Sequence, residues 1–74
     1  MNVIGEIQKN QKEKIIVSTN EYQGHKYIDL RVHYEDETSG EYKPTKKGLA
    51  VSEKNIDGVI KLLTNSKQEL LNGK

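Results

Sequence analysis

The sequence contains no cysteine, tryptophan or phenylalanine, and it has a single proline. Without cysteine the chain can form neither disulfides nor a thiolate metal site. Apolar residues make up 32% of the 74 residues, and no apolar run approaches the length of a membrane span. The N-terminus also lacks the apolar segment of a signal peptide. These absences predict a cytoplasmic protein that has no contact with a membrane.

Large size and strong charge are missing as well. Seventy-four residues predict one domain, residues 1–74, with a small core that is marginally stable alone. Small domains without disulfides or metal usually gain stability from a partner subunit, so we expect a homodimer. The formal net charge is only +1, whereas nucleic-acid-binding domains are usually strongly basic. Any case for a nucleic-acid ligand must therefore rest on how charged and aromatic residues are arranged locally.

The first two thirds of the chain predict strands. Residues 2–9 allow a short strand, and residues 14–20 are rich in β-branched residues. Residues 26–34 alternate between apolar and polar side chains, and Gly24 suits the turn that precedes them. After the polar loop 35–40, residues 41–44 and 48–51 predict two short strands on either side of a tight turn at Thr45-Lys46-Lys47.

The last third predicts one helix. Ser52 suits an N-cap, and an apolar stripe at helical spacing follows, formed by Ile56, Val59, Ile60 and Leu63. Thr64-Asn65-Ser66 is a weak helix former that allows a kink or an early end, and Asn72-Gly73 is a natural stop. Strands followed by a helix predict an α+β domain in which the helix covers one face of an antiparallel sheet.

Residues 22–51 combine tyrosines with cations on the predicted hairpin. Bases of an unpaired nucleic acid strand stack on aromatic rings, and its phosphates lie beside lysine and arginine. The guanidinium of Arg31 could either contact a phosphate or stack on a base. The same residues have plainer interpretations. Tyr22 and Tyr34 also suit rim positions, Arg31 could simply pair with Asp29, and the Lys46-Lys47 pair could be solvated surface. Tyr27 and Tyr42 favour packing or interface positions.

Two stretches resemble a known family. They are YQGHKYIDLRVHY from residue 22 and GEYKPTKKGLAVS from residue 40. Together they are similar to the single-stranded-DNA-binding domain of the transcriptional positive cofactor four family, in its small bacterial YdbC-type form. The resemblance covers residues 12–71. It implies a curved four-stranded antiparallel sheet with one C-terminal helix, assembled as a homodimer that binds unpaired DNA along grooves.

The resemblance also implies roles for single residues. Arg31, Lys46 and Lys47 fall on phosphate-contacting cations, Tyr22 and Tyr34 on base-stacking aromatics, and His25 and Lys43 on cationic positions. The family commonly has tryptophan at Tyr34 and often a basic residue at Gln23 or Asn20. The implied nucleic-acid-binding set is Asn20, Tyr22, Gln23, His25, Arg31, Tyr34, Lys43, Lys46 and Lys47.

Strand parity raises one geometric problem within this set. Residues three apart on a regular strand point to opposite faces, so Arg31 and Tyr34 reach one ligand only through a bulge, strong twist or the strand end. The same parity puts His25, Asp29 and His33 on one face. That trio is a weak candidate for a metal or acid–base site, and we expect no catalysis and no cofactor.

The leading hypothesis is a homodimeric single-stranded-DNA-binding protein of low sequence preference, working near the nucleoid in transcription or DNA maintenance, with the transcription machinery as a further partner. Two alternatives remain open. Stacking platforms do not distinguish RNA from DNA unless something reads the 2′-hydroxyl. The tyrosines could instead anchor a protein partner, which would make the chain an interaction adaptor.

Overall fold

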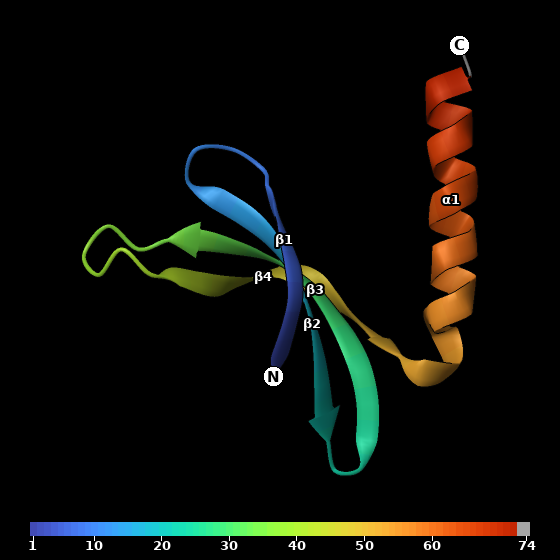
Figure 1. The fold of residues 1–74 in the computed structure, drawn as a ribbon, viewed down its shortest axis with the longest axis horizontal. Helices are drawn as coiled ribbons and strands as arrows, with labels where there is room; N and C mark the ends of the chain where they lie inside the picture. The colour runs from blue at the N-terminus through green and yellow to red at the C-terminus, as the bar shows by residue number, and fades with distance from the viewer. Residues whose placement is uncertain (73–74) are drawn as a thin grey trace.

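The computed structural model describes residues 1–72, and these form four strands followed by one helix (Figure 1). The elements are β1 (Asn2–Gln8), β2 (Glu13–Tyr22), β3 (His25–Glu35), β4 (Tyr42–Ser52), a 3-10 turn (Glu53–Asn55) and α1 (Ile56–Asn72). Neighbouring strands pair antiparallel in the order β1-β2-β3-β4. The predicted α+β arrangement of four antiparallel strands and a C-terminal helix is therefore confirmed.

The β2–β3 hairpin follows its alternating sequence closely. Ten residue pairs, from Glu13↔Tyr34 to Tyr22↔His25, run without a register shift. The two-residue connection is Gln23-Gly24, and both residues have positive φ, 53° and 81°. Positive φ at both central positions is what a type I′ hairpin turn requires, and this turn matches the twist of the strands. The predicted turn at Gly24 is confirmed.

Alternation divides the sheet into two faces, named here after residues of β3. The Arg31 face carries Tyr27, Asp29, Arg31 and His33, together with Ile16 and Ser18 of β2. The Leu30 face carries Ile28, Leu30 and Val32, together with Ile15 and Val17 of β2 and Leu49 and Val51 of β4. The polar groups and the apolar groups of β3 thus lie on opposite sides of one sheet.

The predicted tight turn at Thr45-Lys46-Lys47 is wrong, because β4 is a single strand with a bulge. Arg31 pairs with Gly48 and His33 with Pro44, so residues 45–47 all lie opposite Val32. The Thr45 hydroxyl makes this possible: it donates to the Val32 carbonyl at 2.7 Å and accepts from the Lys47 N–H at 3.1 Å. These bonds replace regular ladder bonds, and such bulges bend the strand.

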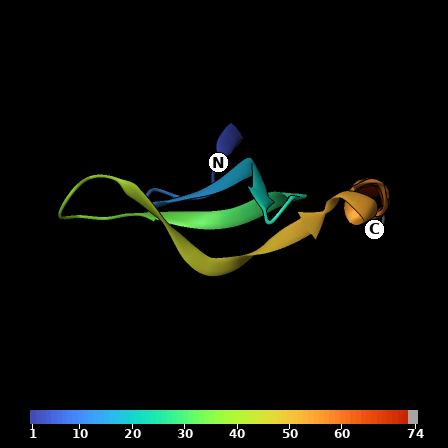
Figure 2. The ribbon, with the colours of Figure 1, turned by 90° about the horizontal axis from the view of Figure 1, so that it is seen from below.

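The expectation that the helix covers the sheet is also wrong for the single chain. Helix α1 leaves the end of β4 and stands beside the sheet (Figures 1 and 2), and none of residues 56–72 is buried. The chain measures 42 × 38 × 18 Å. The buried apolar residues among those described are Ile16 and Val51. Apart from Val51, the Leu30 face is not buried, and much of the apolar stripe of α1 is exposed.

The ends and middle of the helix differ in detail from the sequence prediction. Ser52 makes no side-chain capping bond, and a 3-10 turn precedes α1. The weak segment 64–66 does not end the helix, and within it the Thr64 and Ser66 hydroxyls donate to the carbonyls of Ile60 and Leu62 at 2.8 and 2.7 Å. The predicted stop falls at Asn72, and Gly73 lies outside the described residues.

Candidate nucleic-acid interface

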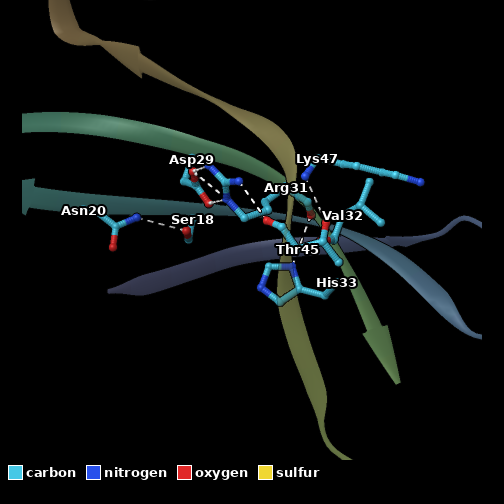
Figure 3. Close-up of polar contacts among 8 residues, drawn as sticks. All are labelled: Ser18, Asn20, Asp29, Arg31, Val32, His33, Thr45 and Lys47. Carbon is cyan, nitrogen blue, oxygen red and sulfur yellow. Dashed lines mark hydrogen bonds and ion pairs between the residues drawn. The ribbon is translucent and has the colours of Figure 1, made fainter. Parts of the chain in front are cut away.

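Arg31 is held in one place on the Arg31 face by hydrogen bonds in several directions (Figure 3). Its Nε donates to both carboxylate oxygens of Asp29, at 3.3 and 3.1 Å, and its Nη2 donates to Asp29 Oδ1 at 3.0 Å. On the other side Nη1 donates to the Thr45 carbonyl at 2.9 Å. The bond to Asp29 raises the pKa of Arg31 further, so the guanidinium is permanently charged.

Gly48 gives this side chain the room to cross β4. A Cβ at position 48 would stand 2.9 Å from both Cγ and Cζ of Arg31, and 2.7 Å from the Leu30 carbonyl oxygen. Side-chain atoms do not approach one another this closely. Glycine at this position therefore lets the guanidinium lie directly over the β4 backbone on its way to Thr45.

Two hollows border the Arg31–Asp29 pair. One, of about 400 Å³, lies toward the hairpin turn and is lined by Tyr22, His25, Tyr27 and Ala50 among others. The second, of about 590 Å³, lies toward β1 and is lined by residues that include Asn20, Tyr27, His33, Tyr42 and Pro44. Tyr27, Asp29 and Arg31 line both hollows. The Arg31 face thus presents tyrosine rings and an arginine to the same open space.

The ring of Tyr42 is less available for stacking on a base than its place in the second hollow suggests. Lys14 Nζ lies 4.3 Å from the centre of the Tyr42 ring and also pairs with Glu6 at 2.8 Å. The Glu6 carboxylate is the main cause that raises the pKa of Lys14. This cation–π contact occupies one side of the ring, in line with the packing role that the sequence favours.

Tyr34 and Lys43 lie elsewhere. They are cross-strand partners at the far end of β3 and β4, and strand parity places them on the Leu30 side. No register shift interrupts the β2–β3 ladder between Arg31 and Tyr34, so the two side chains point to opposite faces. Tyr34 is 42% exposed and lines a separate hollow of about 620 Å³ with Glu35, Asp36 and Glu37.

The cations of the predicted set differ in how free they are. Lys43 pairs with Asp36 at 2.8 Å, which raises the pKa of Lys43. Within residues 1–72, neither Lys46 nor Lys47 forms an ion pair. Both are exposed in the β4 bulge, and the Lys47 side chain extends away from the Arg31–Asp29 pair (Figure 3). The bulge thus offers two exposed positive charges at the edge of the sheet.

The remaining predicted residues cluster around the hairpin end. Tyr22 and His25 are cross-strand partners, and Gln23 forms the turn between them. Asn20 donates to the buried Ser18 hydroxyl at 3.1 Å, which fixes its amide against the Arg31 face. The structure therefore brings together Asn20, Tyr22, His25 and Arg31, whereas Tyr34 and Lys43 lie apart from them.

Tyr27, which the predicted nucleic-acid-binding set omits, lies at the centre of this surface. Tyr27 lines both hollows beside Arg31, whereas the sequence favours a packing or interface role for it. The alternation of residues 26–34 already places it on the face of Arg31, and that parity was the available signal. Among residues 1–72 no group of three or more His, Cys, Asp or Glu side chains is arranged to hold a metal ion. None of the described helices is long and apolar enough to cross a membrane.

Fold and surface together define a small sheet-based binding protein, and comparison with known proteins gives its family. Residues 9–62 match the model of the Transcriptional Coactivator p15 (PC4) family, and the chain belongs to this family. It resembles the orthorhombic crystal structure of a PC4 homolog from Burkholderia pseudomallei, with a TM-score of 0.84, 28% identity, and coverage of 92% of this chain and 90% of that one.

The tetragonal crystal form of the same homolog gives similar values. Its TM-score is 0.82 at 27% identity, covering 89% of this chain and 96% of that chain. No curated protein sequence matches the chain significantly. The resemblance to the cofactor four family noted in the sequence is therefore confirmed, over nearly the whole of the described fold.

Proposed function

We propose that the chain acts as one domain, residues 1–74, that binds single-stranded DNA with low sequence preference. The observation that carries this proposal is the Arg31 face, where Tyr22, Tyr27 and Arg31 line adjoining hollows. Aromatic rings beside cations bind unpaired strands because every base has a stackable face. Membership in the PC4 family supports the same ligand.

The proposed binding surface starts at the hairpin and extends to the β4 bulge. Tyr22 supplies an exposed ring, His25 and Gln23 supply polar groups at the turn, and Lys46 and Lys47 supply phosphate contacts at the sheet edge. The full proposed set remains Asn20, Tyr22, Gln23, His25, Arg31, Tyr34, Lys43, Lys46 and Lys47. No chemical step and no cofactor form part of this proposal.

We further propose a homodimer, because the single chain leaves much of its apolar surface open. Leu49 on the Leu30 face is 56% exposed, and Ile60 and Leu63 on α1 are 56% and 57% exposed. A second copy that covers these surfaces would remove them from water, which stabilises folded chains by about 25 cal/mol per Å² of apolar area.

The biological setting proposed is unwound DNA during transcription or DNA maintenance, in the cytoplasm near the nucleoid. Contacts with the transcription machinery belong to the same proposal, supported by the coactivator family to which the chain belongs.

The decisive experiment is a titration of labelled oligo-dT and of a duplex of equal length, at low and at high salt. We expect tight binding of the single strand, weaker binding of the duplex, and affinity that falls as salt rises. Equal affinity for both ligands, or no binding at low salt, would overturn the proposal. An oligo-U competitor of the same length decides between DNA and RNA as the preferred strand.

A further inference from the structure

The role of Arg31 can be taken beyond that of a phosphate-contacting cation. We infer that the planar guanidinium of Arg31 stacks on a nucleobase, and that Asp29, Thr45 and Gly48 position it. This inference rests on the proposed binding of single strands. Of the two contacts that the sequence leaves open for Arg31, it selects the flat face of a base over the charged backbone of the strand.

Charge compensation is the first argument. A phosphate would have to compete with Asp29, whose carboxylate already receives Nε and Nη2 at 3.0–3.3 Å. Asp29 is only 17% exposed and Arg31 only 24%, so neither charge is free to swing into solvent. A neutralised pair attracts a polyanion weakly, and the negative partner repels a phosphate that approaches closely. Lys46 and Lys47 have no such partner in residues 1–72.

Orientation is the second argument. The guanidinium is tied at one end to Asp29 and at the other to the Thr45 carbonyl at 2.9 Å. Its Cζ lies so close to Gly48 that a Cβ there would be 2.9 Å away. One side of the planar group therefore rests against the β4 backbone. Bonds made in the plane at both ends leave the opposite side for a ligand.

The surroundings are the third argument. The hollows of about 400 and 590 Å³ meet at Arg31 and Asp29. Tyr27 borders both, and Tyr22 borders the one nearer the hairpin. Aromatic walls beside a flat cation suit an unpaired base, because Arg planes stack on bases much as rings do. A phosphate is tetrahedral and gains nothing from such walls.

Arg31→Lys tests the inference directly, because it keeps the charge and removes the plane. We expect oligo-dT affinity to fall about five- to tenfold, at the lower end of base-stacking effects. The slope of log affinity against log salt should stay that of the wild type, since counterion release is unchanged. Retained affinity would mean that charge alone matters and would overturn the inference.

Removal of the whole pair gives a second test. Asp29→Asn with Arg31→Gln removes one positive and one negative charge together, so net charge is unchanged. If Arg31 stacks on a base, this double variant should bind oligo-dT more weakly, with an unaltered slope of log affinity against log salt. A phosphate contact at Arg31 predicts a slope shallower by about 0.7, and that result would overturn the inference.

Asp29→Asn alone separates the two roles by sign. Removal of a carboxylate next to Arg31 should strengthen binding if Arg31 contacts phosphate, because its charge is released. If Arg31 stacks on a base, Asp29→Asn should weaken binding, because the guanidinium loses the bidentate partner that positions it. Circular dichroism of each variant checks that the sheet is folded. If the wild type binds no single strand, the proposed function fails; if it binds but these variants behave as phosphate contacts, only this inference fails.

Discussion

Tyr22 is the residue where the stacking hypothesis can be tested with the least disturbance of the fold. Its side chain is 67% exposed next to the hairpin turn, opposite His25. We expect Tyr22→Ala to weaken oligo-dT binding by about 1–3 kcal/mol, the range for one stacked base. Fluorescence anisotropy titration measures this change directly.

The matched control for this substitution is Tyr22→Phe, which keeps the ring and loses only the hydroxyl. It should bind nearly as the wild type does, because stacking uses the face of the ring. Melting temperatures of both variants should stay close to the wild type, since an exposed residue contributes little packing. Wild-type affinity in Tyr22→Ala would exclude Tyr22 from the interface.

Asp36 gives a prediction for pH. The Lys43 ammonium at 2.8 Å, and then the Thr38 N–H at 2.8 Å, hold the pKa of Asp36 below its usual value. A carboxylate with a lowered folded-state pKa stabilises the fold above its unfolded pKa of about 3.9, and this stabilisation is lost as pH falls through the folded value.

Thermal melting at pH 7 and at pH 3 should therefore show a smaller difference for Asp36→Asn than for the wild type. Glu13 also makes the fold less stable at low pH, because hydrogen bonds from Asn10 and Lys9 lower its pKa as well. Asp36→Asn thus reduces the acid sensitivity without abolishing it. An unchanged pH dependence in this variant would show that the Asp36–Lys43 pair contributes nothing to stability.

At the scale of elements, the β4 bulge concentrates the exposed positive charge. We expect Lys46→Gln with Lys47→Gln to weaken oligo-dT binding and to make the log–log salt slope shallower by about 1.4, for two phosphates released at about 0.7 each. Titrations at four or more salt concentrations measure the slope.

The control for the bulge is Lys54→Gln with Lys61→Gln, which removes the same charge from the 3-10 turn and helix α1. These lysines lie outside the proposed surface, so the slope should change less. If both double variants flatten the slope equally, net charge explains the effect and the bulge has no special role.

Local patterns predicted some elements well and others poorly. The alternation of β3 and the glycine of the hairpin turn are encoded by neighbouring residues, and both were predicted correctly. The bulge was missed because it depends on the Thr45 hydroxyl bonding to Val32, a residue 13 positions earlier. The same holds for Gly48, which in sequence only begins the strand after the predicted turn, whereas in the fold its missing side chain leaves room for Arg31.

The interface itself was only partly accessible to sequence reasoning. Parity could place Tyr27 with Arg31, and it correctly set Tyr34 on the opposite side. It could not show that Lys43 is engaged by Asp36, or that Arg31 is tied to the Thr45 carbonyl. Both contacts depend on how β4 returns along β3, which is decided by tertiary structure.

On the scale of the whole molecule, the open helix predicts association. Ile60→Glu with Leu63→Glu places two charges in the apolar stripe of α1, where burial in a dimer would be costly. We expect the wild type to sediment as a dimer at micromolar concentration and this variant as a monomer. Asn65→Glu with Gln68→Glu adds the same charges to the opposite side of the helix and should remain dimeric.

A wild type that sediments as a stable monomer would contradict this prediction. It would also mean that the Leu30 face stays in contact with water, although Leu30 and Val32 alternate as core residues do. The oligomeric state therefore tests the proposed assembly independently of DNA binding.

The strand order β1-β2-β3-β4 has a consequence for how the chain reaches its fold. Each strand pairs with its neighbour in sequence, so the sheet can form by successive hairpin closures that span short loops. Proteins dominated by such local contacts cross their folding barrier quickly. Helix α1 has few partners in its own chain, so we expect the proposed dimer to stabilise it. Stopped-flow refolding should accordingly show a fast phase independent of protein concentration and a slower phase whose rate rises with it.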